Sequence, residues 1–171
     1  MVMGRGKLDR LAKNQVIDRL WDRDHTLWNP DPANIDDRLM WLDVVDYMRP
    51  FVSELISFSN EIATESFRNV LILGTGGSGL APHVISTTLG DTDNYPALIL
   101  SDSTVPGAIR SLSALIDPSR TLFIVSSKSG NTIETNVLYK HFRSLSDVGS
   151  NFVAITDPNT PLLDVATEND F

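Results

Sequence analysis

Four short apolar runs limit what this chain can fold into more than any other feature of its sequence. The runs are VLIL (70–73), ALIL (97–100), LFIV (122–125) and FVAI (152–155). Apolar runs of this length without alternation are typical of parallel strands covered on both faces. The segments between them, residues 78–90, 105–115 and 131–145, can each hold one helix with its loops, as in repeated βαβ units. The sequence therefore predicts an α/β fold with a doubly wound parallel sheet.

The first 66 residues have a helical pattern instead. One amphipathic helix is predicted by apolar residues at spacings near three and four, namely Leu8, Leu11, Ile17, Leu20 and Trp21. The prolines of WNPDPAN end it. Further helices are expected from about Ile35 to Met48 and from Pro50 onward. We expect a helical segment over residues 1–66 and an α/β domain over residues 67–171.

The carboxyl end of the sequence, DPNTPLLDVATENDF, has the pattern of a turn, a helix and the first residue of another strand. An open sheet of this type normally continues at such a point. We therefore expect this chain to be the amino-terminal part of a longer protein.

Charge and composition restrict the partners. The formal net charge is −8, so the average field repels nucleic acids and anionic membranes, and an anionic ligand must be held by local groups. Without cysteine the chain has no disulfide and no thiolate nucleophile or zinc ligand. The apolar runs are far shorter than the roughly 20 residues that cross a bilayer. We expect a soluble, cytoplasmic protein that binds neither membranes nor nucleic acids.

The first loop that could bind a ligand is GTGGSG, Gly74 to Gly79, between the first apolar run and a predicted helix. Glycines allow a close approach of the backbone to a ligand, and amides at a helix start favour an oxyanion. The loop also matches G-x-G-x-x-G, and Asp102 ends the next strand, as a ribose-binding acid would in a dinucleotide fold. A nicotinamide or flavin dehydrogenase and a tight turn without a ligand both remain alternatives.

The second loop, SSKSGNTIET from Ser126 to Thr135, follows the third apolar run. It places hydroxyl groups, a lysine and a glycine at the start of a helix, a set of donors suited to a phosphate monoester. The alternative is an ordinary helix start, with Ser129 or Asn131 as N-cap and Glu134 completing a capping box. Capping accounts for one hydroxyl group and leaves the others and the lysine unexplained.

The two loops in this order resemble the first sugar isomerase (SIS) domain of the glucose-6-phosphate isomerase family, in its bacterial form. The resemblance is strong over about residues 65–171 and looser before them. It implies interconversion of glucose 6-phosphate and fructose 6-phosphate through a cis-enediol, without a cofactor, in a homodimer. It also implies that the phosphate is held by Gly77, Ser78, Ser127, Lys128, Ser129 and Thr132.

The same resemblance implies that this chain has no catalytic residue. In the family, the Glu that moves the proton, the Arg that stabilises the enediolate, and the His and Lys of ring opening lie in the carboxyl-terminal half. We assign Glu134 no catalytic role, only a favourable electrostatic interaction with the helix start or a hydrogen bond within the site. Local substitutes are not favoured: we interpret His83 as a surface or packing residue, His141 as a partner for a helix C-terminus, and His25 as part of an aromatic anchor with its neighbouring tryptophans.

The acidic pairs have ordinary structural explanations, and two other protein classes remain alternatives. Asp36 and Asp37 are interpreted as a helix start, and Asp91 and Asp93 as a solvated loop. Two alternatives to the isomerase use the same fold: a SIS module that senses a phosphosugar, and a small isomerase with catalytic groups shared across subunits. The sensor class usually carries a basic DNA-binding helix-turn-helix, which residues 1–66 do not show.

Overall fold

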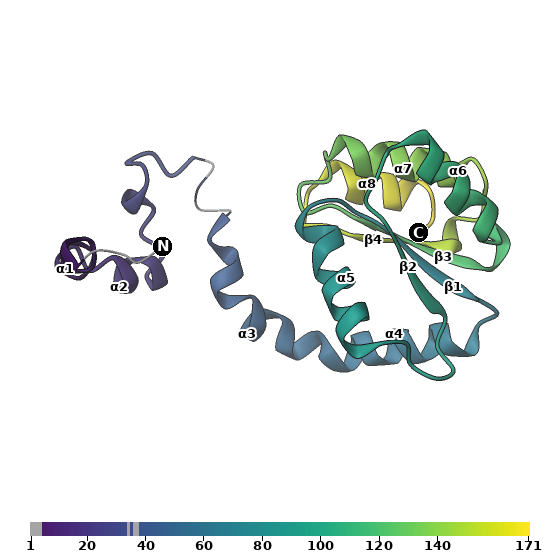
Figure 1. The fold of residues 1–171 in the computed structure, drawn as a ribbon, viewed down its shortest axis with the longest axis horizontal. Coiled ribbons are helices and arrows are strands. Elements are labelled where there is room, and N and C mark those ends of the chain that lie inside the picture. Colours follow the sequence, from purple (N-terminus) through teal and green to yellow (C-terminus); the bar gives the residue numbers. More distant parts are fainter. Residues whose placement is uncertain (1–4, 34, 36–37) are drawn as a thin grey trace. The chain divides into compact units, whose positions relative to one another are not determined.

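The computed structural model describes residues 5–33, 35 and 38–171. The chain divides into two compact units, residues 1–57 and 58–171. Each is described by itself below (Figure 1).

The first unit consists of helices and turns, and its helices begin and end at other residues than predicted. The prediction of one continuous helix here is wrong. The structure has two helices, α1 (Arg5–Lys13) and α2 (Val16–Trp21). Gln15 lies between them with a φ of 49°, and its N–H donates to the carbonyl of Ala12 at 3.0 Å. A left-handed residue after the last turn is a common way for a helix to end, and it does not need glycine.

The second predicted helix is also only partly correct. The structure has a 3₁₀ turn, η3 (Met40–Asp43), followed by the short helix α3 (Val44–Met48). Asp36 and Asp37 lie outside the described residues. Pro50 falls in the 3₁₀ turn η4 (Arg49–Phe51) that leads into α4 (Val52–Thr64), which confirms a helix starting near this proline.

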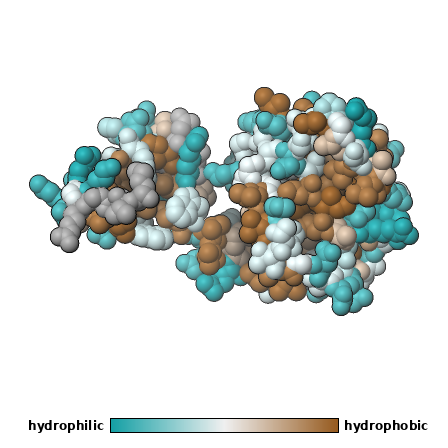
Figure 2. Space-filling model, viewed as in Figure 1, coloured by the Kyte–Doolittle hydropathy of each residue, from teal (hydrophilic) through white to brown (hydrophobic). Residues whose placement is uncertain are grey.

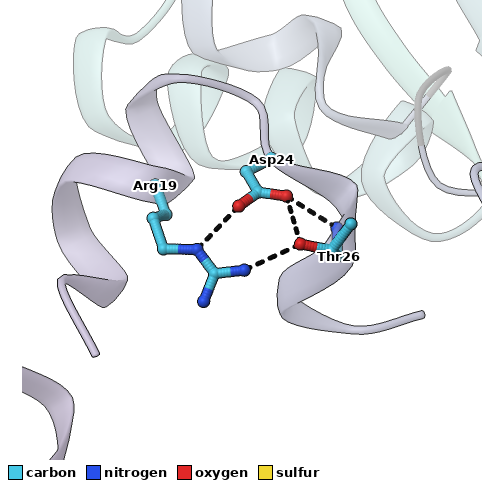
Figure 3. Close-up of polar contacts among 3 residues, drawn as sticks. All are labelled: Arg19, Asp24 and Thr26. Carbon is cyan, nitrogen blue, oxygen red and sulfur yellow. Dashed lines mark hydrogen bonds and ion pairs between the residues drawn. The ribbon is translucent and has the colours of Figure 1, made fainter. Parts of the chain in front are cut away.

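A polar cluster fixes the segment after α2 (Figure 3). Asp24 is the N-cap of the 3₁₀ turn η1 (His25–Leu27), and one of its oxygens accepts hydrogen bonds from the backbone N–H and the hydroxyl of Thr26. Its other oxygen accepts a hydrogen bond from Arg19 Nε at 2.6 Å. The Thr26 hydroxyl and the Arg19 guanidinium lower the pKa of Asp24 to about 2. The flanking Trp21 and Trp28 are exposed.

The second unit contains the predicted parallel sheet. Its strands are β1 (Asn69–Leu73), β2 (Ala97–Ser101), β3 (Thr121–Ser126) and β4 (Phe152–Ile155), which confirms all four apolar runs as strands. The strand order is β2-β1-β3-β4 and every pairing is parallel. In the central pair, Asn69 lies opposite Thr121 and Leu73 opposite Val125.

The connections confirm a doubly wound sheet (Figure 1). The helices are α5 (Gly77–Leu89), α6 (Pro106–Leu115), α7 (Ile133–Arg143) and α8 (Pro161–Glu168), and two 3₁₀ turns, η5 (Pro118–Arg120) and η6 (Gly149–Asn151), precede β3 and β4. Helices α6, α7 and α8 lie on one face of the sheet, and α5 lies on the other. The chain therefore reverses its direction across the sheet between β1 and β3.

The core lies between the sheet and the three-helix face. Leu71 and Leu73 of β1 and Phe123 and Val125 of β3 all face it and are fully buried. The ring of Phe123 stacks on Phe152 with centroids 4.7 Å apart. Phe171, expected to begin another strand, is not in a strand here: its ring stacks on Phe152 at 5.3 Å.

The α5 face is less covered than the sequence predicts. β2 is an edge strand, and its first residues Ala97 and Leu98 are exposed, as are the apolar side chains of Leu80 and Val84 on α5. Figure 2 shows hydrophobic surface in a broad band across this unit. The expectation of strands covered on both faces is thus correct for β1 and β3 and wrong for the edge strands β2 and β4, since Ile155 at the end of β4 is also exposed.

The low pKa of Asp24 predicts how the stabilisation by this cluster depends on pH. Because its pKa falls from 3.8 to about 2, the cluster's stabilisation should be fully present above about pH 4 and be lost as the pH drops to about 2. A carbon-detected NMR titration should give a midpoint near 2 for the Asp24 carboxyl. Asp24→Asn should weaken amide protection of η1 at neutral pH, whereas Asp9→Asn on α1 should not. A midpoint near 4 in a unit that is still folded would contradict the cluster.

Candidate functional site

The two loops singled out in the sequence lie side by side at the switch in strand order. β1 and β3 are neighbours, yet β1 leads into α5 on one face of the sheet and β3 into α7 on the other. A Cβ added to Gly74 would lie 3.2 Å from the Ser126 carbonyl oxygen, which shows how closely the loops approach. Open parallel sheets bind ligands at this position, beyond the carboxyl ends of the strands.

Glycines shape the first loop. Gly76 has a φ of 58°, and a Cβ on Gly79 would lie 2.5 Å from the Gly74 carbonyl oxygen, so a side chain at residue 79 would collide with the loop backbone. Gly77 and Ser78 are the first two residues of α5. The N–H groups at these positions have no carbonyl acceptor within their own helix, so they can serve a ligand.

The second loop brings two of the predicted hydroxyl residues together. The Oγ of Ser127 is 2.9 Å from Oγ1 of Thr132, and the Ser127 residue is only 3% exposed. Gly130 has a φ of 68° and donates its N–H to the Ser127 carbonyl at 3.1 Å, which closes the loop. Ser129 is exposed and accepts a hydrogen bond from the Asn131 N–H at 3.3 Å.

The helix start differs from the capping alternative. Thr132 is the N-cap of α7, in place of Ser129 or Asn131, and its side chain caps no helix N–H. Glu134 is exposed in the first turn. The Thr132 hydroxyl faces Ser127 instead, so capping does not account for this hydroxyl pair.

A third segment, the β4–α8 loop (residues 156–160), contacts the second loop and was missed by the sequence reasoning. Lys128 Nζ lies 3.5 Å from Asp157 Oδ2. The carbonyl of Lys128 accepts hydrogen bonds from the Asp157 N–H at 3.1 Å and from the Thr156 hydroxyl at 3.4 Å. The sequence did contain a signal for this contact. A polar turn follows the last apolar run directly, so it begins at the carboxyl ends of the strands, where the second loop also begins.

One buried hydroxyl next to the site has no partner. Thr135 lies in the first turn of α7 and is 1% exposed, and its Oγ1 makes no hydrogen bond within the described structure. An unsatisfied buried hydroxyl costs about 1–3 kcal/mol of stability.

The position of His141 and the exposure of His83 agree with their interpretation as structural residues, whereas the aromatic anchor around His25 stays a prediction. His141 lies in the last turn of α7, as predicted, and its Nε2 is 2.8 Å from the Ser113 hydroxyl of α6. His25 Nε2 is 3.2 Å from the Pro30 carbonyl oxygen. His83 is exposed on α5.

His83 also lines an open groove of about 640 Å³ beside β2, together with Gly76 and Asp102. This groove joins the first loop to the acidic residue that the dinucleotide alternative requires. That alternative leaves the hydroxyl residues of the second loop without a role. Among the described residues, no group of three or more His, Asp and Glu side chains is placed to hold a metal ion.

Comparison with known proteins decides the family. The sequence profile of phosphoglucose isomerase matches residues 33–160. The chain belongs to the phosphoglucose isomerase family. It is 27% identical to a glucose-6-phosphate isomerase of Desulfitobacterium hafniense (strain Y51) over 94% of its length, and 34% identical to that of Geobacter sulfurreducens over 76%.

One solved structure agrees with the phosphoglucose isomerase assignment, and another shares the fold. A glucose-6-phosphate isomerase from Chlamydia trachomatis superposes with a TM-score of 0.62 at 25% identity, covering 84% of this chain and 27% of its own. A hypothetical protein from Thermus thermophilus shares the fold, with a TM-score of 0.70 at 22% identity, 97% of this chain and 39% of its own. The resemblance noted from the two loops is therefore confirmed.

The chain spans less than a third of the length of these relatives. The chain spans 31% of the length of the Desulfitobacterium relative and 25% of the Geobacter one. Among the described residues, no helix is both long enough and apolar enough to cross a membrane.

The unpartnered Thr135 hydroxyl predicts a stability change. Thr135→Val removes the hydroxyl at nearly constant shape and should raise the free energy of unfolding by about 1 kcal/mol in urea titrations. Thr121→Val is the matched control, because Thr121 is also fully buried but donates a hydrogen bond to the Asp117 carbonyl at 2.7 Å. The control should be destabilised. Equal destabilisation of both variants would show that Thr135 has a partner.

Proposed function

We propose that the second unit is the phosphate-binding part of a glucose-6-phosphate isomerase and holds the phosphate group of glucose 6-phosphate or fructose 6-phosphate. The observation that carries the proposal is the hydroxyl pair of Ser127 and Thr132, 2.9 Å apart at the start of α7 and at the switch in strand order. Family membership supports the same substrate class.

A phosphate monoester suits the donors of the two loops. Hydroxyl groups, backbone N–H groups at the starts of α5 and α7, and one ammonium group are short donors that can surround a dianion. The chain carries a net charge of −8, so such local donors must hold the anion against the average field. The proposed ligand residues are Gly77, Ser78, Ser127, Lys128, Ser129 and Thr132.

The proposed reaction needs groups beyond these. An aldose phosphate and its ketose differ in the position of one carbonyl, so the reaction moves one proton between C2 and C1 and another between their oxygens. No electrons are exchanged with a second compound, so no redox cofactor takes part. A base near C1 and C2 removes the proton from one carbon, which gives a cis-enediol intermediate, and returns it to the other carbon. We assign no catalytic residue to this chain, and we propose that the whole protein is a cytoplasmic homodimer.

Ligand binding tests the phosphate residues. Ser127→Ala should weaken binding of fructose 6-phosphate by about 1.5–3 kcal/mol, because the hydroxyl is buried and would face a charged group. Lys128→Ala should cost about 1 kcal/mol, since its side chain is 57% exposed and solvent screens the charge. Calorimetry measures both. Ser150→Ala, at the amino edge of the sheet in η6, is the control and should bind normally. Unchanged affinity in both loop variants would remove the phosphate assignment.

Catalysis by the isolated chain is a separate test. We expect no isomerase turnover above background when formation of glucose 6-phosphate from fructose 6-phosphate is coupled to its dehydrogenase. The Desulfitobacterium relative, assayed in parallel, is the positive control. Robust turnover by the isolated chain that is lost in Ser127→Ala would show that the catalytic groups lie within these 171 residues.

A further inference from the structure

Lys128 is held from two sides by the β4–α8 loop. Its carbonyl accepts hydrogen bonds from Thr156 and Asp157, and its ammonium group lies 3.5 Å from the Asp157 carboxylate. The two loops also pack tightly, since a Cβ added to Gly130 would lie 2.8 Å from Thr160 Cβ. The hydroxyls of Thr156 and Thr160 are 2.7 Å apart, which ties the β4–α8 loop to the start of α8.

This arrangement joins an acidic group to the cation of the proposed phosphate loop. The Asp157 and Lys128 side chains are 48% and 57% exposed, so the pair is accessible to an incoming anion and is screened by salt. A carboxylate in this position offers Lys128 the same kind of partner as a phosphate oxygen. An anion at the second loop must therefore share the Lys128 ammonium group with the Asp157 carboxylate or displace that carboxylate from it.

We propose that Asp157 is a positioning residue that holds the Lys128 ammonium group in the unliganded loop, competes with the phosphate monoester for it, and so lowers affinity for the anionic end of the substrate. This inference rests on the proposed function. It assigns a role to the β4–α8 loop in setting how strongly the site responds to ligand charge. Uncharged sugars would not meet this competition.

Asp157→Asn is the sharpest test because it removes the charge and keeps the backbone N–H that bonds to the Lys128 carbonyl. The variant should bind fructose 6-phosphate about two- to fivefold more tightly at low salt, the range expected for loss of an exposed ion pair. The gain should vanish in about 0.5 M NaCl, where screening is strong. Binding of fructose, which lacks the phosphate, should not change.

Two controls separate competition at Lys128 from a general charge effect. Asp147→Asn makes the same change in net charge at an exposed residue on the opposite edge of the sheet, just before η6, and should leave affinity unchanged. In a Lys128→Ala background, Asp157→Asn should give a clearly smaller gain, because its main partner is gone.

The outcomes distinguish the two proposals. If the wild-type chain binds no fructose 6-phosphate, the proposed function fails and this inference with it. If binding depends on Ser127 but Asp157→Asn behaves like Asp147→Asn, or weakens binding, the inference alone is overturned. A gain that persists in full in the Lys128→Ala background also overturns it, because Asp157 would then act independently of Lys128.

Discussion

The parallel pairing of β1 with β3 is the constraint on which the rest of the second unit depends. It joins strands that are not consecutive in the chain, and it holds them in register from Asn69 opposite Thr121 to Leu73 opposite Val125. Because the helices after these strands leave to opposite faces, the backbone opens at their carboxyl ends. The first loop (Gly74 to Gly79) follows β1 and the second loop (Ser126 to Thr135) follows β3, so both lie at this opening.

The chemistry of this opening follows from the backbone amides and hydroxyl groups that line it. Glycines at residues 74 and 79 allow the turn of the first loop to close on itself, while the amides at the start of α5 remain available. The Ser127 and Thr132 hydroxyls face each other, and the Thr132 side chain caps no helix N–H. A small hydroxyl pair of this kind can rotate its protons toward an anion without moving the backbone. The acidic balance of the chain makes such short-range donors the main source of attraction for a phosphate.

The sequence predicted those parts of the structure that depend on local pattern. The four apolar runs and their spacing were sufficient for the strands and the helices between them, and the order of the two loops was sufficient for the family. It did not predict the break at Gln15, because neither glycine nor proline marks it. The exposure of β2 was missed because burial of an edge strand depends on which elements cover it. Asp157 was missed for a related reason: only the β3–β4 pairing places it beside Lys128.

The most direct test of the account is a crystal structure of this chain with fructose 6-phosphate. The account predicts the phosphate group within hydrogen-bond distance of Ser127 Oγ and Thr132 Oγ1, at the start of α7. A second loop left empty while the ligand, or an added dinucleotide, occupies the groove between Gly76 and Asp102 would contradict it.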